Sequence, residues 1–261
     1  MNLKKTTNPS FHMKKLLLLF ILSISSAAIQ AQSADEILAK YFENTGGIDK
    51  WRALTGLKMS AKVNQMGMDI PLTIYQMKDG RQATVITFQG KEIKQGVFDG
   101  TTLWSTNFMT MKAEKSDAES TENFKANLGD FPDPFLDYKS KGYKVELVGK
   151  ETVDGAECFK IKLTRKPITV DGKPEENSSF YFFDANDYVP VMVENEVKSG
   201  PGKGMASQNK MSDYQEVNGM LFPFSMSMTM KGAGQAQSII TTAVELNPAV
   251  DAAMFTLPVE K

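Results

Sequence analysis

The stretch Phe222-Pro-Phe-Ser-Met-Ser-Met-Thr-Met230 alternates large apolar side chains with small or polar ones. A period of two sends alternate residues to opposite faces of a β-sheet, so this stretch predicts a strand with one apolar face. That face ends in three methionines, which are flexible and adapt to irregular shapes. The pattern therefore fits an ordinary core strand, and it also fits one wall of an adaptable apolar pocket.

The same alternation continues outward from this strand in both directions along the chain. Asp-Gly, Asn-Gly and Gln-Gly dipeptides lie between the alternating segments and are typical of tight hairpin turns. The predicted strands lie at 57–63, 70–74, 83–88, 93–98, 102–108, 143–148, 157–164, 179–183, 191–197, 210–217, 220–230 and 238–246. We therefore expect a mainly β (α+β) fold, with one large antiparallel sheet of about eleven or twelve strands.

Two short helices are expected before the first strand. Ser33 and Glu36 fit a capping box, and the residues that follow form one apolar helical stripe made of Ile37, Leu38, Tyr41 and Phe42. A second short helix is expected over 49–54. Both helices are expected to pack on the sheet. Neither carries a recognisable chemical motif.

The series of strands is interrupted by an insertion between residues 116 and 142. A polar helix is expected at its start, with Ser116 as the N-cap, and a second helix should begin at Asp133 and Pro134. A large sheet with few helices cannot cover its own apolar face unless it closes or is capped. We therefore expect the insertion to cover one face, as long connections that act as lids do.

The N-terminal residues 1–31 have the pattern of a secretory signal peptide. Lys14 and Lys15 precede a short apolar run, and small residues lead to Ala31, where we expect cleavage. The remaining residues 32–261 are expected to form a single exported domain. It should lack a lipid anchor, because no cysteine lies near the cleavage site.

Composition excludes several classes of function. The only histidine, His12, lies in the predicted signal peptide, so histidine-based nucleophilic sites and His-ligated zinc sites are excluded from the mature chain. The only cysteine, Cys158, is expected to be structural, on the less apolar face of its strand. The acidic turn at 184–187 lacks a calcium-loop pattern and is better explained by side chains that bond their own backbone. We predict no enzyme, no cofactor and no metal site.

Charge bears on the partners of the mature chain. The sequence carries 30 basic and 31 acidic side chains, and the predicted signal peptide would remove lysines only. The mature protein is therefore acidic, which argues against nucleic acid as a partner because such binding needs clustered Lys and Arg. We expect a monomer.

The candidate ligand-binding residues are apolar positions that share a strand face or lie in the insertion. By default these side chains form the core, but a curved sheet with a loosely fitting cover would turn them into the lining of a cavity. The candidates are Ile70, Leu72, Ile74, Trp104, Phe135, Leu136, Phe222, Phe224, Met226, Met228 and Met230.

Several short motifs, taken in order, resemble those of the LolA-like outer-membrane lipoprotein-sorting proteins. The motifs are Ala34-Asp-Glu-Ile-Leu-Ala-Lys-Tyr-Phe42 with Gly46-Gly47, Phe98-Asp-Gly-Thr-Thr-Leu-Trp104, Tyr143-Lys-Val-Glu-Leu-Val-Gly149, Phe183-Asp, Tyr188-Val-Pro190 and Asp213-Tyr-Gln-Glu-Val-Asn-Gly-Met-Leu-Phe-Pro-Phe224. The resemblance implies an unclosed, strongly curved half-barrel sheet whose concave face is covered by helices over an apolar cavity.

The same resemblance implies a function and partners. It implies a periplasmic carrier that shields lipoprotein acyl chains or a related lipid, with transfer proteins of the inner or outer membrane as partners. Carriers of this fold use an arginine to hold the cover closed, and the sequence aligns none of Arg52, Arg81 and Arg165 with that role. The alternative from another class is a non-enzymatic periplasmic interaction or scaffold module with a fully packed sheet.

Overall fold

The computed structural model describes residues 32–65, 67–200, 202–234 and 236–258. The strands are β1 (Gly56–Gln65), β2 (Met68–Met77), β3 (Gln82–Phe88), β4 (Lys91–Phe98), β5 (Leu103–Thr106), β6 (Ala113–Lys115), β7 (Lys144–Val153), β8 (Ala156–Thr164), β9 (Ile168–Val170), β10 (Lys173–Glu175), β11 (Ser178–Asp184), β12 (Pro190–Glu196), β13 (Ala206–Val217), β14 (Met220–Met230) and β15 (Gln237–Leu246). The helices are α2 (Ala34–Asn44), α3 (Ile48–Ala53) and α4 (Ala118–Ala126), with short 3-10 helices η1 (Leu128–Asp130) and η2 (Ala252–Met254). The predicted signal peptide lies outside the described residues, and the division into 1–31 and 32–261 stays a prediction.

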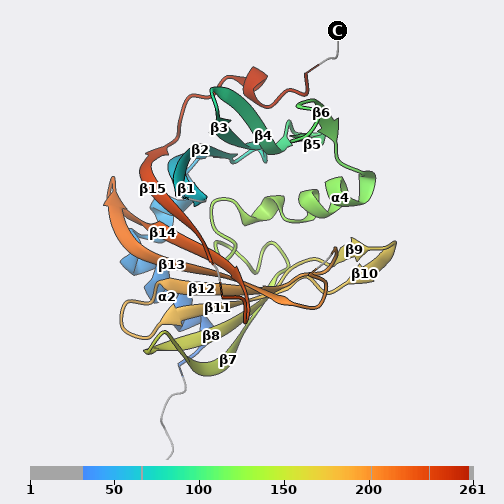
Figure 1. Cartoon of the computed structure of the whole chain (residues 1–261). Coiled ribbons are helices and arrows are strands. Elements are labelled where there is room, and N and C mark those ends of the chain that lie inside the picture. Colours follow the sequence, from blue (N-terminus) through green and yellow to red (C-terminus); the bar gives the residue numbers. More distant parts are fainter. Residues whose placement is uncertain (1–31, 66, 201, 235, 259–261) are drawn as a thin grey trace, which may run out of the picture. The chain divides into compact units, whose positions relative to one another are not determined.

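Thirteen strands form one antiparallel sheet in the order β6-β5-β4-β3-β2-β1-β15-β14-β13-β12-β11-β8-β7. The strands β6 and β7 stand at opposite ends of this order and do not pair with each other, so the sheet is unclosed. Figure 1 shows it curving around the part of the chain that contains α4. The predicted unclosed, curved antiparallel sheet is therefore confirmed. No described helix is both long enough and apolar enough to cross a membrane.

The main core lies between the sheet and the segments packed on it. The predicted stripe of α2 is buried, and Trp51 of α3 joins it, with its ring 5.5 Å from that of Phe222 on β14. Residues 135–136 of the insertion enter the same core, where the Phe135 ring lies 5.5 Å from that of Phe183 on β11. Full burial of one such side chain contributes about 1.5–3 kcal/mol.

The opposite face of β8, β11 and β12 carries a second buried cluster. Cys158 is fully buried there, with Phe182 and Met192. Cys158 shares this face with Lys160, as the sequence predicted, and Phe159, Ile161 and Leu163 of the same strand face the main core. Burial raises the pKa of the Cys158 thiol.

Three local predictions in the loops and the insertion need correction. Helix α4 is capped by Asp117, whose carboxylate accepts from the Ser120 amide, instead of Ser116. The segment from Asp133 forms successive turns instead of a helix, since Asp137 has a φ of 51° that helical backbone cannot continue through. Between the strands predicted at 157–164 and 179–183, where no strand was expected, β9 pairs with β10 in a small hairpin.

The acidic turn after β11 agrees with its interpretation from the sequence. The Asp184 carboxylate accepts hydrogen bonds from the backbone amides of Asn186 and Asp187 at 2.7 and 3.0 Å. These contacts satisfy the turn locally, as Asp side chains commonly do.

The last strand of the sheet, β7, has an irregular free edge. Its pairing with β8 shifts register between Leu147 and Gly149, and Gly149 has a φ of 152°. Charged residues such as Lys144 and Glu146 alternate along it with less exposed side chains. At the other end of the sheet, β6 is only 3 residues long.

Candidate ligand-binding site

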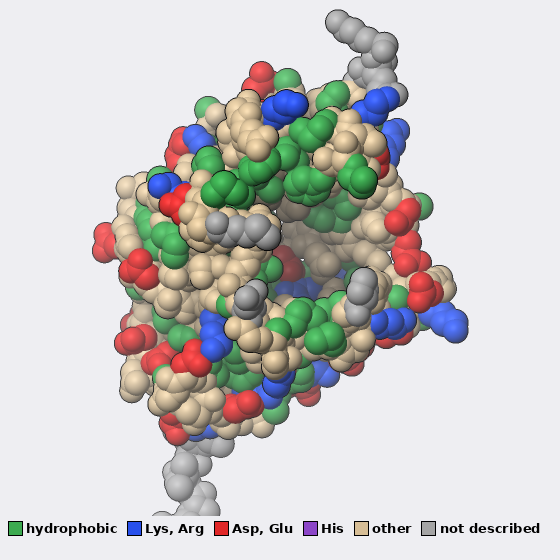
Figure 2. Space-filling model, in the orientation of Figure 1, with side chains coloured by type: hydrophobic (Ala, Val, Ile, Leu, Met, Phe, Trp, Pro, Cys, Tyr) green, Lys and Arg blue, Asp and Glu red, His purple; other side chains and the backbone are tan. Residues whose placement is uncertain are grey.

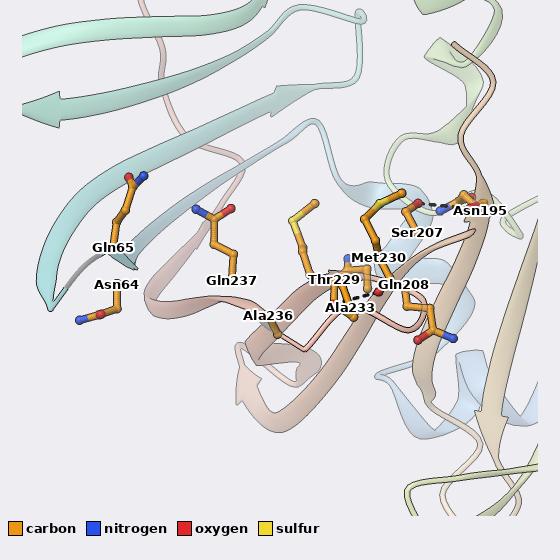
Figure 3. Close-up of a pocket in the computed structure, with 12 residues that line it drawn as sticks. Asn64, Gln65, Asn195, Ser207, Gln208, Thr229, Met230, Ala233, Ala236 and Gln237 are labelled. Carbon is orange, nitrogen blue, oxygen red and sulfur yellow. Dashed lines mark hydrogen bonds between the residues drawn. The ribbon is translucent and has the colours of Figure 1, made fainter. Parts of the chain in front are cut away.

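A pocket of about 960 Å³ opens where the ends of five neighbouring strands meet. Figure 2 shows the molecule hollowed on this side, and Figure 3 shows the lining side chains. The described lining residues come from β1, β12, β13, β14, β15 and the turn between the last two, and they are Asn64, Gln65, Asn195, Ser207, Gln208, Asn209, Met228, Thr229, Met230, Ala233, Ala236 and Gln237. Amide and hydroxyl side chains therefore outnumber the apolar ones.

The strand register explains how amides and methionines share this pocket. On β14, Met228 pairs with Asn209 of β13 on one side and with Gln237 of β15 on the other. Continuing the β1–β15 register places Gln65 next to Gln237, and Figure 3 shows both side chains directed to the same side of the sheet. We call Gln65, Gln237 and Asn209 the amide row; it runs across the sheet, with Met228 between Gln237 and Asn209.

A second set of polar groups lies beside the amide row, toward the strand ends. Met230 pairs with Ser207, and Ser207 pairs with Asn195 of β12. The Ser207 hydroxyl donates to the backbone oxygen of Asn195 at 3.3 Å (Figure 3). The pocket floor is therefore a hydrogen-bonding surface that two methionines interrupt.

Burial changes sharply along the inner face of β14. Phe222 is 5% exposed and Phe224 is 9% exposed, whereas Met228 is 49% exposed. Met226 is half-buried and pairs with Ile239 on β15. One continuous strand face thus begins in the main core and ends in the open pocket.

Most of the predicted cavity residues lie in packed clusters away from this pocket. Trp104 is buried beside Phe255 in a cluster of its own, and its indole nitrogen donates to the Phe255 backbone oxygen at 2.9 Å. Seven more candidates belong to the main core or to the smaller cluster on β1 and β2, and they are Ile70, Leu72, Ile74, Phe135, Leu136, Phe222 and Phe224. Of the eleven candidates, the structure brings Met228 and Met230 to the pocket. That any candidate contacts a ligand stays a prediction.

The amides of the pocket were missed by sequence reasoning. Asn209 and Gln237 sit in strands that the sequence does predict, but only the register shows that they face Met228. The alternation in β13 contains a signal for the position of Asn209. Asn209 is two residues from Met211 and so shares its face of the sheet, and Met211 pairs with Met226 of β14. The sequence alone gives no pairing between strands, so this signal could not be used.

A buried arginine ties the insertion to the sheet near the pocket. The Arg165 side chain is 8% exposed, and its guanidinium donates to the Asp130 carboxylate at 2.7 Å, the Ser179 hydroxyl at 2.8 Å and the Tyr181 hydroxyl at 3.0 Å. The Tyr143 hydroxyl donates to the other oxygen of Asp130 at 3.0 Å. Burial raises the pKa of Tyr181 to about 12, and burial followed by the Asp130 charge raises that of Tyr143 to about 12.

The same network reaches the lining of the pocket. The Ser179 hydroxyl, which accepts from Arg165, donates to the Asn195 side-chain oxygen at 2.6 Å. Asn195 lines the pocket. A continuous chain of hydrogen bonds therefore joins Asp130 in the insertion to the pocket lining.

Two further contacts fasten the insertion to the N-terminal helices. Arg52 of α3 donates to both oxygens of Asp137, at 3.2 and 2.7 Å, on the surface. The Tyr41 hydroxyl donates to the Asp133 carboxylate at 2.8 Å, and burial raises the pKa of Asp133 despite this bond. The insertion is thus held by polar contacts at its margins and by Phe135 and Leu136 at its centre.

The fold and the site together define a class: an unclosed, curved antiparallel sheet with helices and an insertion packed on it, and a pocket at one end. A family model with the description "-like: Uncharacterized protein" matches residues 132–258. No curated protein matches the sequence significantly.

Solved structures give the more particular comparison. A LolA superfamily protein from Nitrosomonas europaea is 14% identical with a TM-score of 0.52, covering 87% of this chain and 98% of its own. A putative outer membrane lipoprotein-sorting protein domain from Vibrio parahaemolyticus is 12% identical with a TM-score of 0.50, covering 84% and 94%. A DUF1329 family protein from Desulfovibrio piger is 14% identical with a TM-score of 0.50, covering 84% and 97%. The chain has the fold of these proteins, which confirms the resemblance seen in the sequence at the level of the fold.

Proposed function

We propose that the protein is an exported, periplasmic, non-enzymatic carrier that holds lipoprotein acyl chains or a related lipid against the inner face of its sheet. The observation that carries this proposal is the inner face of β14, which runs from the packed core into a pocket of about 960 Å³. An acyl chain offers no polar feature to recognise, so it needs an adaptable apolar surface. Met228 and Met230 supply such a surface at the pocket.

The energetics favour a chain that extends from the pocket toward the core. Each CH₂ group removed from water contributes about 0.8 kcal/mol, so affinity depends on how much of the chain is covered. The pocket itself is open, and Met228 alone covers little. Deeper burial along Met226 toward Phe224 would require the insertion to move, since Phe135 and Leu136 fill the core there.

The margins of the insertion are suited to such a movement. The Arg52–Asp137 pair lies on the surface, where both partners can exchange their contact for water. Arg165 is the arginine whose buried side chain grips the insertion, through Asp130. We assign to Arg165 the role of holding the cover closed, with which the sequence aligned none of the three arginines, although Arg165 bonds a carboxylate.

One observation favours the second candidate function, a packed interaction or scaffold module. Phe135 is 3% exposed and Leu136 is 6% exposed, so the centre of the insertion is built into the core in this state. A module of this kind would never open and would bind no acyl chain. The two functions differ in a single measurable property, the uptake of lipid.

Native mass spectrometry tests the proposal on the mature protein, purified without detergent from the periplasm of its own host. Acyl species that co-purify and are released on mild activation are the expected result. A second sample carries Met228→Lys, which should abolish the adducts. The matched control is Ile240→Lys, because Ile240 is 47% exposed on β15. Its side chain lies on the opposite face of the sheet from that of Ile239, which pairs with Met226. An apo mass that stays unchanged after incubation with lipids and a triacylated peptide would support the packed module.

A further inference from the structure

The amide row has hydrogen-bonding capacity that the described part of the chain does not use. The side-chain carboxamides of Gln65 and Gln237 make no hydrogen bond to any described residue, and both side chains are exposed at the pocket. The Asn209 side-chain oxygen is buried and also has no partner. Leaving a buried acceptor unsatisfied is unfavourable, so Asn209 would gain from a bound group that donates to it, and the exposed amides of Gln65 and Gln237 are free to bind the same group.

The chemistry of the lining restricts what that group can be. None of the described lining residues carries a charge, so a phosphate or carboxylate entering the pocket would lose water without gaining a counter-charge. None of them is aromatic either, so a sugar ring would lack a π-face on which to pack its C–H groups. A carboxamide offers both donors and an acceptor, which matches a peptide group, itself one donor and one acceptor.

The geometry adds a second match. The amide row runs across strand ends beside Met228, so polar and apolar contacts lie next to each other on one surface. A residue that carries acyl chains and is followed by uncharged polypeptide also presents an apolar part, the acyl chains, next to a polar part, the backbone amides. Its chains would lie on Met228 and Met230, and its backbone amides would meet Gln65 and Gln237.

We propose that the amide row recognises the uncharged polypeptide backbone that adjoins an acylated residue. This inference rests on the proposed carrier function and goes beyond it, because it states which part of the cargo is read in addition to its acyl chains. Asn209, the cross-strand neighbour of Met228, adds an unpaired acceptor beside this site for a peptide N–H.

The test compares acyl probes that differ only beside the acyl chains, with affinity measured by displacement of an apolar dye. The probes are a diacylated cysteine methyl ester, the same acylated cysteine followed by Ser-Ser-Ala-Gly amide, and that peptide with Asp in place of both serines. We expect the neutral peptide to bind roughly tenfold tighter than the methyl ester, as two net hydrogen bonds would give. The acidic peptide should lose this advantage.

The variant Gln65→Met/Gln237→Met keeps the side-chain volume and removes both carboxamides. It should bind the methyl ester like the wild type and bind the neutral peptide no better than the methyl ester. Gln215→Met is the matched control, because Gln215 is an exposed glutamine of β13 outside the pocket. It should leave all affinities unchanged.

The outcomes separate this inference from the function on which it rests. Equal affinity for the ester and the neutral peptide, or an unaffected double variant, would overturn the amide row as a peptide site and leave the carrier standing. Tighter binding of a glycosyl diacylglycerol than of the neutral peptide would overturn it in favour of a polyol headgroup. Failure of every acyl probe to displace the dye would overturn the carrier itself, and the inference with it.

Discussion

The two ends of the inner face of β14 are built from one alternating pattern but lie in different surroundings. At one end Phe222 packs against Trp51 of α3 in the main core. At the other end Met228 lies between Asn209 and Gln237 in the open pocket. The difference shows that an apolar stripe on a strand does not by itself determine whether its side chains are buried. The residues that pack beside it determine whether a position lies in the core or in an open pocket.

The centre of the insertion belongs to the core end of this comparison. Phe135→Ala together with Leu136→Ala should lower the free energy of unfolding by more than about 4 kcal/mol, since each substitution leaves a cavity in packed surroundings. Urea denaturation measures this loss. Phe108→Ala with Met109→Ala is the control, because these side chains are 61% and 94% exposed. A small loss in the first variant, with increased uptake of an apolar dye, would show instead that the insertion is the loose cover expected from the sequence.

The buried arginine should have the next largest effect. Arg165→Met leaves the Asp130 carboxylate without its ion pair and should cost about 3 kcal/mol, and adding Asp130→Asn should recover part of it. Thermal unfolding of the single and double variants checks this. Arg52→Met, whose ion pair with Asp137 is exposed, should change the melting temperature little. If the two arginine variants were equally stable, Arg165 would not be what holds the insertion.

The stability of the protein is expected to depend on pH through the buried carboxyl group of Asp133. The pKa of Asp133 is raised by burial, so its contribution to stability is fully present below the unfolded pKa and is lost as pH rises through the folded one. Asp133→Asn should therefore become more stable relative to the wild type as pH rises from 4 to 7. Melting temperatures across this range test the sign. A difference that shrinks with rising pH would mean that the Tyr41 bond outweighs burial.

The smallest effect on stability is expected at the pocket end. Met228→Ala removes a half-exposed side chain and should change the free energy of unfolding by less than about 0.5 kcal/mol. It should nevertheless weaken binding of an acyl probe, measured by dye displacement. Ile240→Ala changes a side chain on the opposite face of the sheet and should affect neither the free energy of unfolding nor the binding of the probe. Equal binding by both variants would remove the distinction between the two ends of the face.

The fold was largely predictable because it depends on local patterns. Alternation and turn dipeptides located nearly all of the strands, and the stripe of α2 was correct to the residue. The errors arose where one segment depends on a distant one. Asp133 was expected to start a helix, and one oxygen of its carboxylate does accept from the Phe135 amide, but the other accepts from Tyr41 of α2 and the segment forms turns.

The pocket was much less predictable, for the same reason. Met228 and Met230 were found because their own strand shows the pattern. Gln65 and Gln237 come from opposite ends of the chain, and only the pairing of β1 with β15 brings them together. Arg165 could not be chosen from three arginines, because its partner Asp130 lies in an insertion whose path the sequence does not show.

The irregular outer edge of β7 affects whether another protein molecule can add a strand to the open sheet. A sheet that stays open to hold a pocket leaves backbone N–H and C=O groups unpaired at its ends, and such an edge invites strand addition by another molecule. The register shift at Gly149 bends this edge away from straight pairing, and Lys144 and Glu146 place charges along it. At the opposite end, β6 is too short to template a partner. The open sheet is thereby protected against edge-to-edge aggregation at both of its ends.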